Sequence, residues 1–163
     1  MEYSILPMLP DHWAAVREIY GQGIATGNAT FETELPDWEK WDSSHRKDCR
    51  FVAAGGEVLG WAALSAVSTR RVYRGVAEVS VYVAATARGR GVGKALLEAL
   101  VKESEVNGVW TLQAGIFPEN TASIELHKSC GFREVGVRRR IGKLGEVWRS
   151  VALLERRSTT VCV

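Results

Sequence analysis

The chain has 163 residues, and its 21 lysines and arginines nearly balance 19 aspartates and glutamates. This length fits one domain with a buried core, and the balanced charge argues against nucleic acid as a partner, because such binding needs a strongly basic face. The cysteines, Cys49, Cys130 and Cys162, have no metal-ligand or disulfide spacing, and there is no signal segment or membrane-spanning apolar run, so we expect a cytoplasmic protein with no metal site and no membrane partner.

The first half of the chain is predicted to alternate between strands and helices. Trp13, Val16 and Ile19 have the spacing of one helix face, and Gly55-Gly56 separates two apolar runs as a hairpin turn does. The expected elements are a strand at 3–6, a helix from Asp11 to about Gly21, a loop at 21–34, a helix opened by Pro36, and strands at 51–54, 58–66 and 76–84.

The second half continues this alternation. Asn107-Gly108 is a left-handed stop signal for a long helix. The expected elements are a helix from Ala95 to this stop, a strand at 110–116, a helix from 118–120 to about Cys130, and strands at 131–140 and 147–154 around a turn at 143–145. We expect residues 1–158 to form one domain and residues 159–163 a frayed tail, and the exposed-looking edge at 147–154 predicts a homodimer.

The most informative stretch is Arg88-Gly89-Arg90-Gly91-Val92-Gly93-Lys94, between an apolar strand and a long helix. Its alternate glycines remove the Cβ atoms from the turn, so backbone N–H groups can approach a ligand closely. These groups open a helix, whose dipole attracts anions, and the basic side chains add positive charge. The stretch therefore predicts a phosphate-binding loop, the alternative being an ordinary strand-to-helix turn.

Two familiar phosphate loops do not fit this stretch. The P-loop pattern G-x-x-x-x-G-K-S/T requires a glycine where this chain has Arg88. It also requires a metal-binding hydroxyl after the lysine, where this chain has Ala95. The dinucleotide-binding pattern G-x-G-x-x-G has two residues between its second and third glycines, whereas this chain has one between Gly91 and Gly93. That pattern also expects an acidic residue at the end of the next strand, and the strand at 110–115 does not end in one.

The stretch from Arg88 to Gly93 resembles the R/Q-x-x-G-x-G/A loop of the GNAT N-acetyltransferases, which binds the pyrophosphate of acetyl-CoA. Further blocks are similar to the phosphinothricin/methionine sulfoximine N-acetyltransferase branch: Thr30-Phe31-Glu32, 78–83, 117–123, Leu126-His127, 131–133 and 148–150. The resemblance implies an α/β (α+β) GNAT fold, with a mixed, mostly antiparallel sheet of about seven strands and helices on both faces. Ser150 departs from the branch, which commonly has Asp there, and we expect no catalytic consequence.

The resemblance implies an acetyl-CoA-dependent enzyme that acetylates the α-amine of a small amino-acid-like acceptor by direct transfer. Transfer to an amine needs a proton acceptor and a proton for the departing thiolate. Glu78 stands where the branch has its base, the alternative being an exposed strand-end glutamate. His127 stands where other GNAT members often carry a tyrosine acid, and its imidazole is predicted to act as an acid or in a proton relay, unless it is only packed.

The remaining predicted site residues follow from the expected geometry and from the resemblance. Backbone groups of an incompletely paired strand are expected to bind the pantetheine arm, and Asn120 either reaches that arm or only caps its helix. The predicted cofactor-binding residues are Val81, Tyr82, Val83, Arg88, Gly89, Arg90, Gly91, Val92, Gly93, Lys94 and Asn120. The predicted acceptor-binding residues are Phe31, Glu32, Arg70, Arg71, Arg74 and Glu78.

These acceptor residues have plain alternatives: the arginines could form a solvated loop, Phe31 could belong to the core and Glu32 to the surface. Arginine suits carboxylate, phosphinate or sulfonyl oxygens, and the resemblance implies methionine sulfoximine, methionine sulfone and phosphinothricin as acceptors. Other acceptor amines (an aminoglycoside, a polyamine or a peptide N-terminus) and a non-catalytic acyl-CoA-binding module remain as alternatives.

Overall fold

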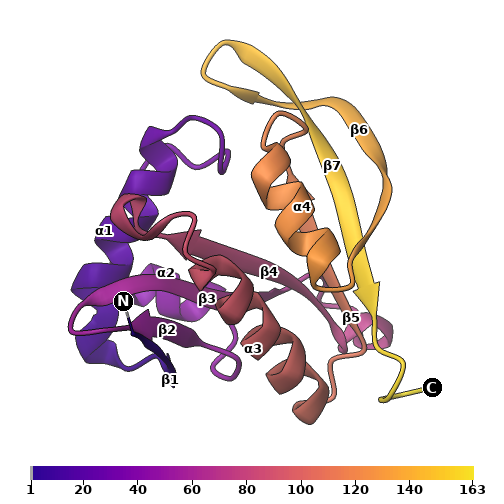
Figure 1. Ribbon diagram of the computed structural model, residues 1–163. Coiled ribbons are helices and arrows are strands. Elements are labelled where there is room, and N and C mark those ends of the chain that lie inside the picture. Colours follow the sequence, from indigo (N-terminus) through magenta and orange to yellow (C-terminus); the bar gives the residue numbers. More distant parts are fainter. Residues whose placement is uncertain (1) are drawn as a thin grey trace.

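The computed structural model describes residues 2–163, which form a seven-stranded sheet in the order β1-β2-β3-β4-β5-β7-β6 (Figure 1). The strands are β1 (Ser4–Pro7), β2 (Phe51–Ala54), β3 (Val58–Ala66), β4 (Val76–Val83), β5 (Thr111–Ile116), β6 (Arg133–Leu144) and β7 (Val147–Arg157). The helices are α1 (Trp13–Ala25), α2 (Trp38–Ser44), α3 (Val92–Val106) and α4 (Thr121–Ser129). This is the predicted mixed sheet, and within the described residues no helix is long and apolar enough to cross a membrane.

The sheet splits between β4 and β5, its one parallel pair. Only 76–78 of β4 pair with 111–113 of β5, although both strands continue beyond this point. The other edge of β4 stays paired with β3 as far as Val83. The strands therefore diverge, and the backbone of β4 beyond Glu78 keeps one edge that no strand covers.

Helices cover both faces of the central strands. Leu96 and Val92 of α3 approach Gly60 of β3 from one face, while Tyr20 of α1 and Trp41 of α2 contact Trp61 from the other. For this reason residues 59–64 are all buried, as expected for a strand with apolar neighbours on both faces. Both faces contribute to one hydrophobic core.

Helix α3 begins at Val92, three residues before the expected Ala95, and ends where the glycine predicts. Gly91 is its N-cap with φ of +79°, and Gly108, two residues after its last turn, has φ of +73°. Both values lie in the left-handed region that glycine adopts without strain. The predicted stop at Asn107-Gly108 is confirmed.

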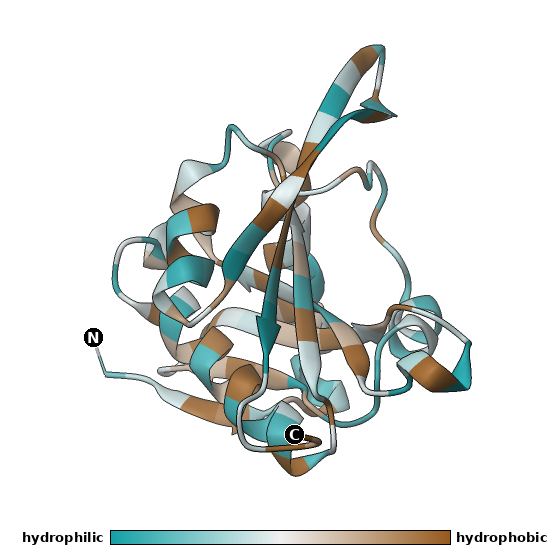
Figure 2. Cartoon of the chain, turned by 90° about the vertical axis from the view of Figure 1, so that its right-hand side faces the viewer, coloured by the Kyte–Doolittle hydropathy of each residue, from teal (hydrophilic) through white to brown (hydrophobic). Residues whose placement is uncertain are grey.

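The last two strands form a hairpin arm, β6–β7, that extends beyond the body of the molecule (Figures 1 and 2). The prediction that 147–154 is a sheet edge is wrong, because β7 lies between β5 and β6. The edge is β6, which runs four residues further than expected because its strand continues through a bulge between Arg138 and Gly142. Arg140 has φ of +48° there, and its N–H donates to Ser150 Oγ at 3.0 Å.

The residues after β7, which the sequence predicts to be a frayed tail, have no helix or strand but contact the body of the protein at several points. Arg157 donates to Ser158 O at 2.9 Å and to Cys162 O at 2.6 Å. The Thr160 hydroxyl donates to Glu105 Oε2 at 2.7 Å. The arginine lies inside the last strand, so its reach to the following carbonyls could not be read from the polar composition of the tail.

Candidate active site

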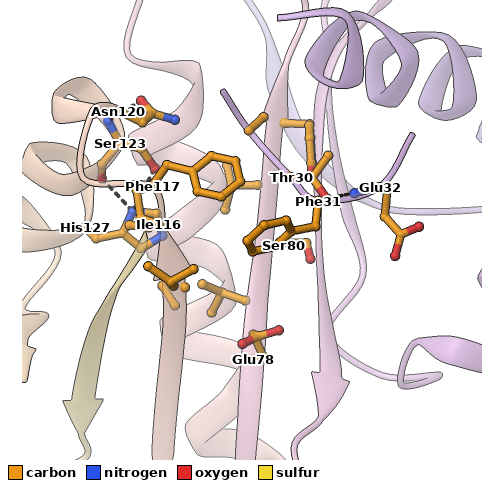
Figure 3. Close-up of a pocket in the computed structure, with 17 residues that line it drawn as sticks. Thr30, Phe31, Glu32, Glu78, Ser80, Ile116, Phe117, Asn120, Ser123 and His127 are labelled. Atoms are coloured by element: carbon orange, nitrogen blue, oxygen red, sulfur yellow. Dashed lines mark hydrogen bonds between the residues drawn. The ribbon is translucent and has the colours of Figure 1, made fainter. Parts of the chain in front are cut away.

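Two adjoining cavities open where β4 and β5 diverge. The first, called here the glycine-loop cavity, has a volume of about 580 Å³ and is lined by the end of β4, the start of α3 and α4. The second, the Glu78 cavity, has a volume of about 390 Å³ and lies beside Glu78, the loop after α1, and β5 (Figure 3). Both are lined by Ala29, Val81, Tyr82, Asn120 and Ser123, so they meet above the uncovered edge of β4.

The glycine-loop cavity contains every predicted cofactor residue except Arg90, which is in the loop but not in the cavity lining. Helix α3 presents its first amides here, and Ala95 N–H is bonded to Gly91 O at 3.0 Å, so the N–H groups before it precede the regular hydrogen bonds of the helix. Arg88 and Lys94 add positive charge beside them. The arrangement suits an anion such as a pyrophosphate.

The glycines leave room for that anion. A Cβ at Gly91 would have only Tyr3 Oη at 4.0 Å as a neighbour, and one at Gly89 would have nothing within 4 Å. A Cβ at Gly93 would lie 3.2 Å from Leu126 Cδ2, so this glycine lets α3 approach α4. The loop therefore has two functions: open space at Gly89 and Gly91, and close helix packing at Gly93.

Glu78 lies in the second cavity with an exposed carboxylate. Its Oε1 accepts a hydrogen bond from Gln113 Nε2 at 3.2 Å across the last paired position of β4 and β5. The sequence left open whether Glu78 is a base in the site or an exposed strand-end glutamate. In the structure Glu78 is exposed and also lines the cavity. A carboxylate in this position can accept a proton from an amine directly or through water.

His127 lies in the same cavity but is buried, with 5% of its surface exposed. Its Nδ1 is 2.7 Å from Ser123 O, and because a carbonyl only accepts, Nδ1 carries the proton. Burial lowers the pKa of the imidazole below its usual 6.5, against the opposing effect of the Ser123 carbonyl. The neutral ring thus presents Nε2 as a proton acceptor, and it can act as an acid only after it has accepted a proton.

This burial predicts a dependence of stability on pH. His127 and His45 both have a lowered pKa, caused mainly by desolvation, so the unfolded chain binds their protons more readily than the folded protein does. The free energy of unfolding should therefore fall as the pH decreases below 6.5. His127→Gln should reduce this slope, leaving the part due to His45, as measured by denaturant unfolding at several pH values; an unchanged slope would contradict the buried, neutral imidazole.

Asn120 is the N-cap of α4, which was one of its two predicted roles, and the other role, contact with the pantetheine arm, stays a prediction. Its Oδ1 caps α4 by accepting from Ser123 N at 3.2 Å, and its Nδ2 donates to Asn28 O at 3.2 Å. The residue also lines both cavities. Burial raises the pKa of the neighbouring Tyr82 phenol, which keeps a neutral hydroxyl at the junction of the two cavities.

The acceptor-binding predictions divide into two groups. Phe31 and Glu32 line the Glu78 cavity. Arg70, Arg71 and Arg74 are absent from the lining of both cavities among the described residues, and they lie in the connection between β3 and β4. There Arg70 lies over Tyr73 and Arg74 over Trp110, so the structure does not bring these arginines to the other site residues.

Several lining residues were not predicted. Asn28, Ser80, Ser123 and Phe117 line one or both cavities. Ser123 could have been suggested by its position three residues after the N-cap Asn120. The role of Asn28 had no local signal, because it depends on contacts with residues far along the chain.

A glycine loop that opens a helix, an uncovered strand edge and an adjoining cavity with a carboxylate suit an enzyme that holds a phosphate-bearing co-substrate beside an acceptor. The model of the Acetyltransferase (GNAT) family matches residues 13–132, so the chain belongs to the GNAT family of acetyltransferases.

Two curated relatives agree with this assignment. A phosphinothricin N-acetyltransferase of Alcaligenes faecalis is 36% identical over 159 residues, covering 90% of this chain and 78% of the relative. An L-methionine sulfoximine/L-methionine sulfone acetyltransferase of Pseudomonas paraeruginosa is 31% identical over 151 residues, covering 90% of this chain and 87% of the relative. The resemblance to this branch is confirmed.

A solved structure supports both the fold and the co-substrate. A GNAT phosphinothricin acetyltransferase from Sinorhizobium meliloti in complex with acetyl-CoA matches with a TM-score of 0.89 and 28% identity, covering 99% of this chain and 91% of that one. The protein is thus an N-acetyltransferase with acetyl-CoA as co-substrate, and the glycine-loop cavity fits the pyrophosphate of that molecule.

Proposed function

We propose that this enzyme acetylates the α-amine of a small amino-acid-like acceptor of the methionine sulfone, methionine sulfoximine or phosphinothricin type. The observation that carries the proposal is the junction of the two cavities at Val81, Tyr82 and Asn120, with Glu78 on the acceptor side. Acetyl-CoA supplies the activated acetyl group when bound. The names of the two curated relatives support the acceptor class.

Different residues of the chain bind acetyl-CoA, transfer protons and contact the acceptor in this proposal. The α3 amides, Arg88 and Lys94 hold the pyrophosphate, and the free edge of β4 offers backbone groups to the pantetheine arm. Glu78 accepts the proton of the acceptor ammonium. Once the free amine has bonded to the thioester carbonyl carbon, His127 Nε2 accepts the second proton that this nitrogen loses and passes it to the thiolate as the C–S bond breaks, which makes His127 a relay rather than a resting acid. Phe31 and Glu32 bound the acceptor.

A second candidate acceptor is favoured by the charge of the Glu78 cavity. Among the residues that the structure describes, its lining contains two carboxylates, Glu32 and Glu78, and neither lysine nor arginine. Such a cavity suits an amine with a cationic side chain, as in a polyamine or an aminoglycoside. It also favours the neutral tails of methionine sulfone and sulfoximine over the anionic tail of phosphinothricin.

An acceptor panel tests the proposal. With acetyl-CoA fixed, we expect kcat/KM for methionine sulfone to exceed that for a simple alkylamine by roughly 10- to 150-fold. The alkylamine lacks the carboxylate and sulfonyl oxygens, and the loss of one charge-assisted hydrogen bond to such a group costs about 1.5–3 kcal/mol. Thiol release is the measurement. A diamine or aminoglycoside that outperforms the sulfone would replace the proposal with the second candidate, and release without any acceptor dependence would indicate no transfer to these amines.

The contact of the acceptor with Arg70, Arg71 or Arg74 that the sequence predicts is not supported by the lining of either cavity, and it has its own test. Each arginine is replaced by alanine, and the KM of methionine sulfone is compared with that of acetyl-CoA. A raised acceptor KM with an unchanged acetyl-CoA KM supports the contact. Three silent substitutions would leave recognition to Phe31, Glu32 and the rest of the cavity lining.

We further propose a homodimer formed through the arm, in the cytoplasm. Strand β6 is an uncovered sheet edge with exposed Val135, Val137 and Ile141, the kind of edge that pairs with another chain. The cysteines are unpaired in the described part of the chain, which fits a reducing compartment. Sedimentation of the wild type and of Val137→Lys tests the dimer: a monomeric wild type would exclude it.

A further inference from the structure

Arg149 of the arm joins three segments that are far apart in the sequence. Its side chain is 15% exposed. The guanidinium donates to Gly27 O at 2.8 Å and to Asn28 Oδ1 at 2.9 Å, both in the loop after α1. It also pairs with Glu119 Oε2 at 3.4 Å and lies 3.9 Å from the ring centroid of Phe117, both between β5 and α4. A planar fork that stacks and donates at once is specific to arginine.

The loop that Arg149 holds forms part of both cavities. Asn28 lines the glycine-loop cavity, Ala29 lines both, and 30–32 line the Glu78 cavity. Asn28 is held twice across the cleft, because its side chain accepts from Arg149 and its carbonyl accepts from Asn120. The loop therefore depends on one contact from β7 and one from α4.

The same arm fixes an aromatic wall of the Glu78 cavity. Phe31 and Phe117 pack edge to face with ring centroids 4.9 Å apart, and Figure 3 shows the two rings next to each other. Arg149 lies over Phe117. On the arm, a Cβ at Gly142 would lie 3.0 Å from Phe31 Cζ, so the β6 backbone approaches this ring closely. Phe31 is 37% exposed, so these neighbours are its main support.

We propose that Arg149 is a positioning residue for acceptor binding: it fixes the loop from Gly27 to Glu32 and, through Phe117, the position of Phe31. Arg149 lines neither cavity, so it acts through the residues it holds. The expected effect of Arg149 on acceptor kinetics rests on the proposed function. The expected effect of Arg149 on the order of the loop does not depend on that function.

The test compares two substitutions of Arg149 with a control substitution elsewhere on the hairpin arm. Arg149→Met retains a long apolar stem over Phe117 but removes the donors, and Arg149→Lys retains one cation without the fork. Arg133→Met is the control, since Arg133 pairs with Glu155 at 2.6 Å on the arm itself and its side chain is 68% exposed. The measurements are hydrogen exchange over 26–34 and over α3, the Kd of acetyl-CoA by calorimetry, and kcat and KM for the acceptor.

We expect Arg149→Met to speed exchange over 26–34 without changing it over α3. The acceptor KM should rise by about 10- to 100-fold, as for the loss of one or two charge-assisted hydrogen bonds, while the Kd of acetyl-CoA changes by less than about 3-fold. Arg149→Lys should recover part of the KM, and Arg133→Met should match the wild type in every measurement.

Two outcomes would overturn the proposal. Equal exchange over 26–34 in Arg149→Met and the wild type would show that the loop is held without Arg149. Faster exchange over α3 as well, or an equal loss in kcat and in acetyl-CoA affinity, would show a general structural role. Asn28→Ala, which removes the same hydrogen bond from the loop side, keeps the exchange test decisive if Arg149→Met does not fold. A wild type that acetylates no amino acid would refute the proposed function and leave the exchange result intact.

Discussion

Replacing Glu78 by glutamine will lower turnover by about 10²- to 10⁴-fold at neutral pH if Glu78 is the sole base. Glutamine has nearly the same shape and can keep the contact with Gln113 Nε2, which is 3.2 Å from Glu78 Oε1 in the wild type, but it cannot take a proton from an ammonium group. Because Glu78 is absent from the lining of the glycine-loop cavity, the Kd of acetyl-CoA should not change. Thiol release gives kcat, and calorimetry gives the Kd.

The matched control is Glu32→Gln. Glu32 is the other carboxylate among the described residues of the same cavity lining, so this variant removes an equal charge from the same cavity. We expect its main effect on the acceptor KM. If both variants lower kcat equally, the effect of Glu78 is electrostatic, and near-normal turnover of Glu78→Gln would show that water or His127 takes the proton.

Replacing Gly91 by aspartate will weaken acetyl-CoA binding by at least about 100-fold, or about 3 kcal/mol. Gly91 is the N-cap of α3, and an aspartate N-cap accepts hydrogen bonds from the first amides of its helix. The carboxylate would therefore occupy the donors that face the pyrophosphate and would repel the anion. The fold should survive, because the nearest neighbour of a Cβ at Gly91 is Tyr3 Oη at 4.0 Å and aspartate tolerates positive φ.

Gly108→Asp provides the comparison for that variant. Gly108 follows the other end of the same helix with a similar φ of +73° and has nothing within 4 Å of an added Cβ. It has the same backbone strain and the same added charge, away from the cavity, so its Kd for acetyl-CoA should equal that of the wild type. Unchanged affinity in Gly91→Asp would refute the assignment of the glycine loop to the pyrophosphate.

The sequence by itself determined the features that depend on neighbouring residues. The glycines at 89, 91 and 93 predicted a loop opening α3, Asn107-Gly108 its end, and Asn120 the cap of α4, and the structure confirms these three. Each is a matter of backbone conformation or a hydrogen bond within one helical turn. The same local blocks were enough for the family, because its motifs are contiguous.

Only the tertiary structure decided which side chains share the site. It brought Glu78, His127, Phe31 and Glu32 to one cavity but left the arginines of 70–74 outside it. It also placed β7 inside the sheet, which no property of 147–154 alone could reveal.

Arg149 illustrates why these features could not be predicted from the sequence. Its hydrogen bond to Gly27 O joins residues 122 positions apart, and the burial that fixes the protonation of His127 comes from packing against Phe132 and the sheet. Such contacts are set by how the strands diverge and where the arm folds back. Residue spacing determines local conformation and contacts within one helical turn, whereas burial and long-range hydrogen bonds follow only from the packed fold.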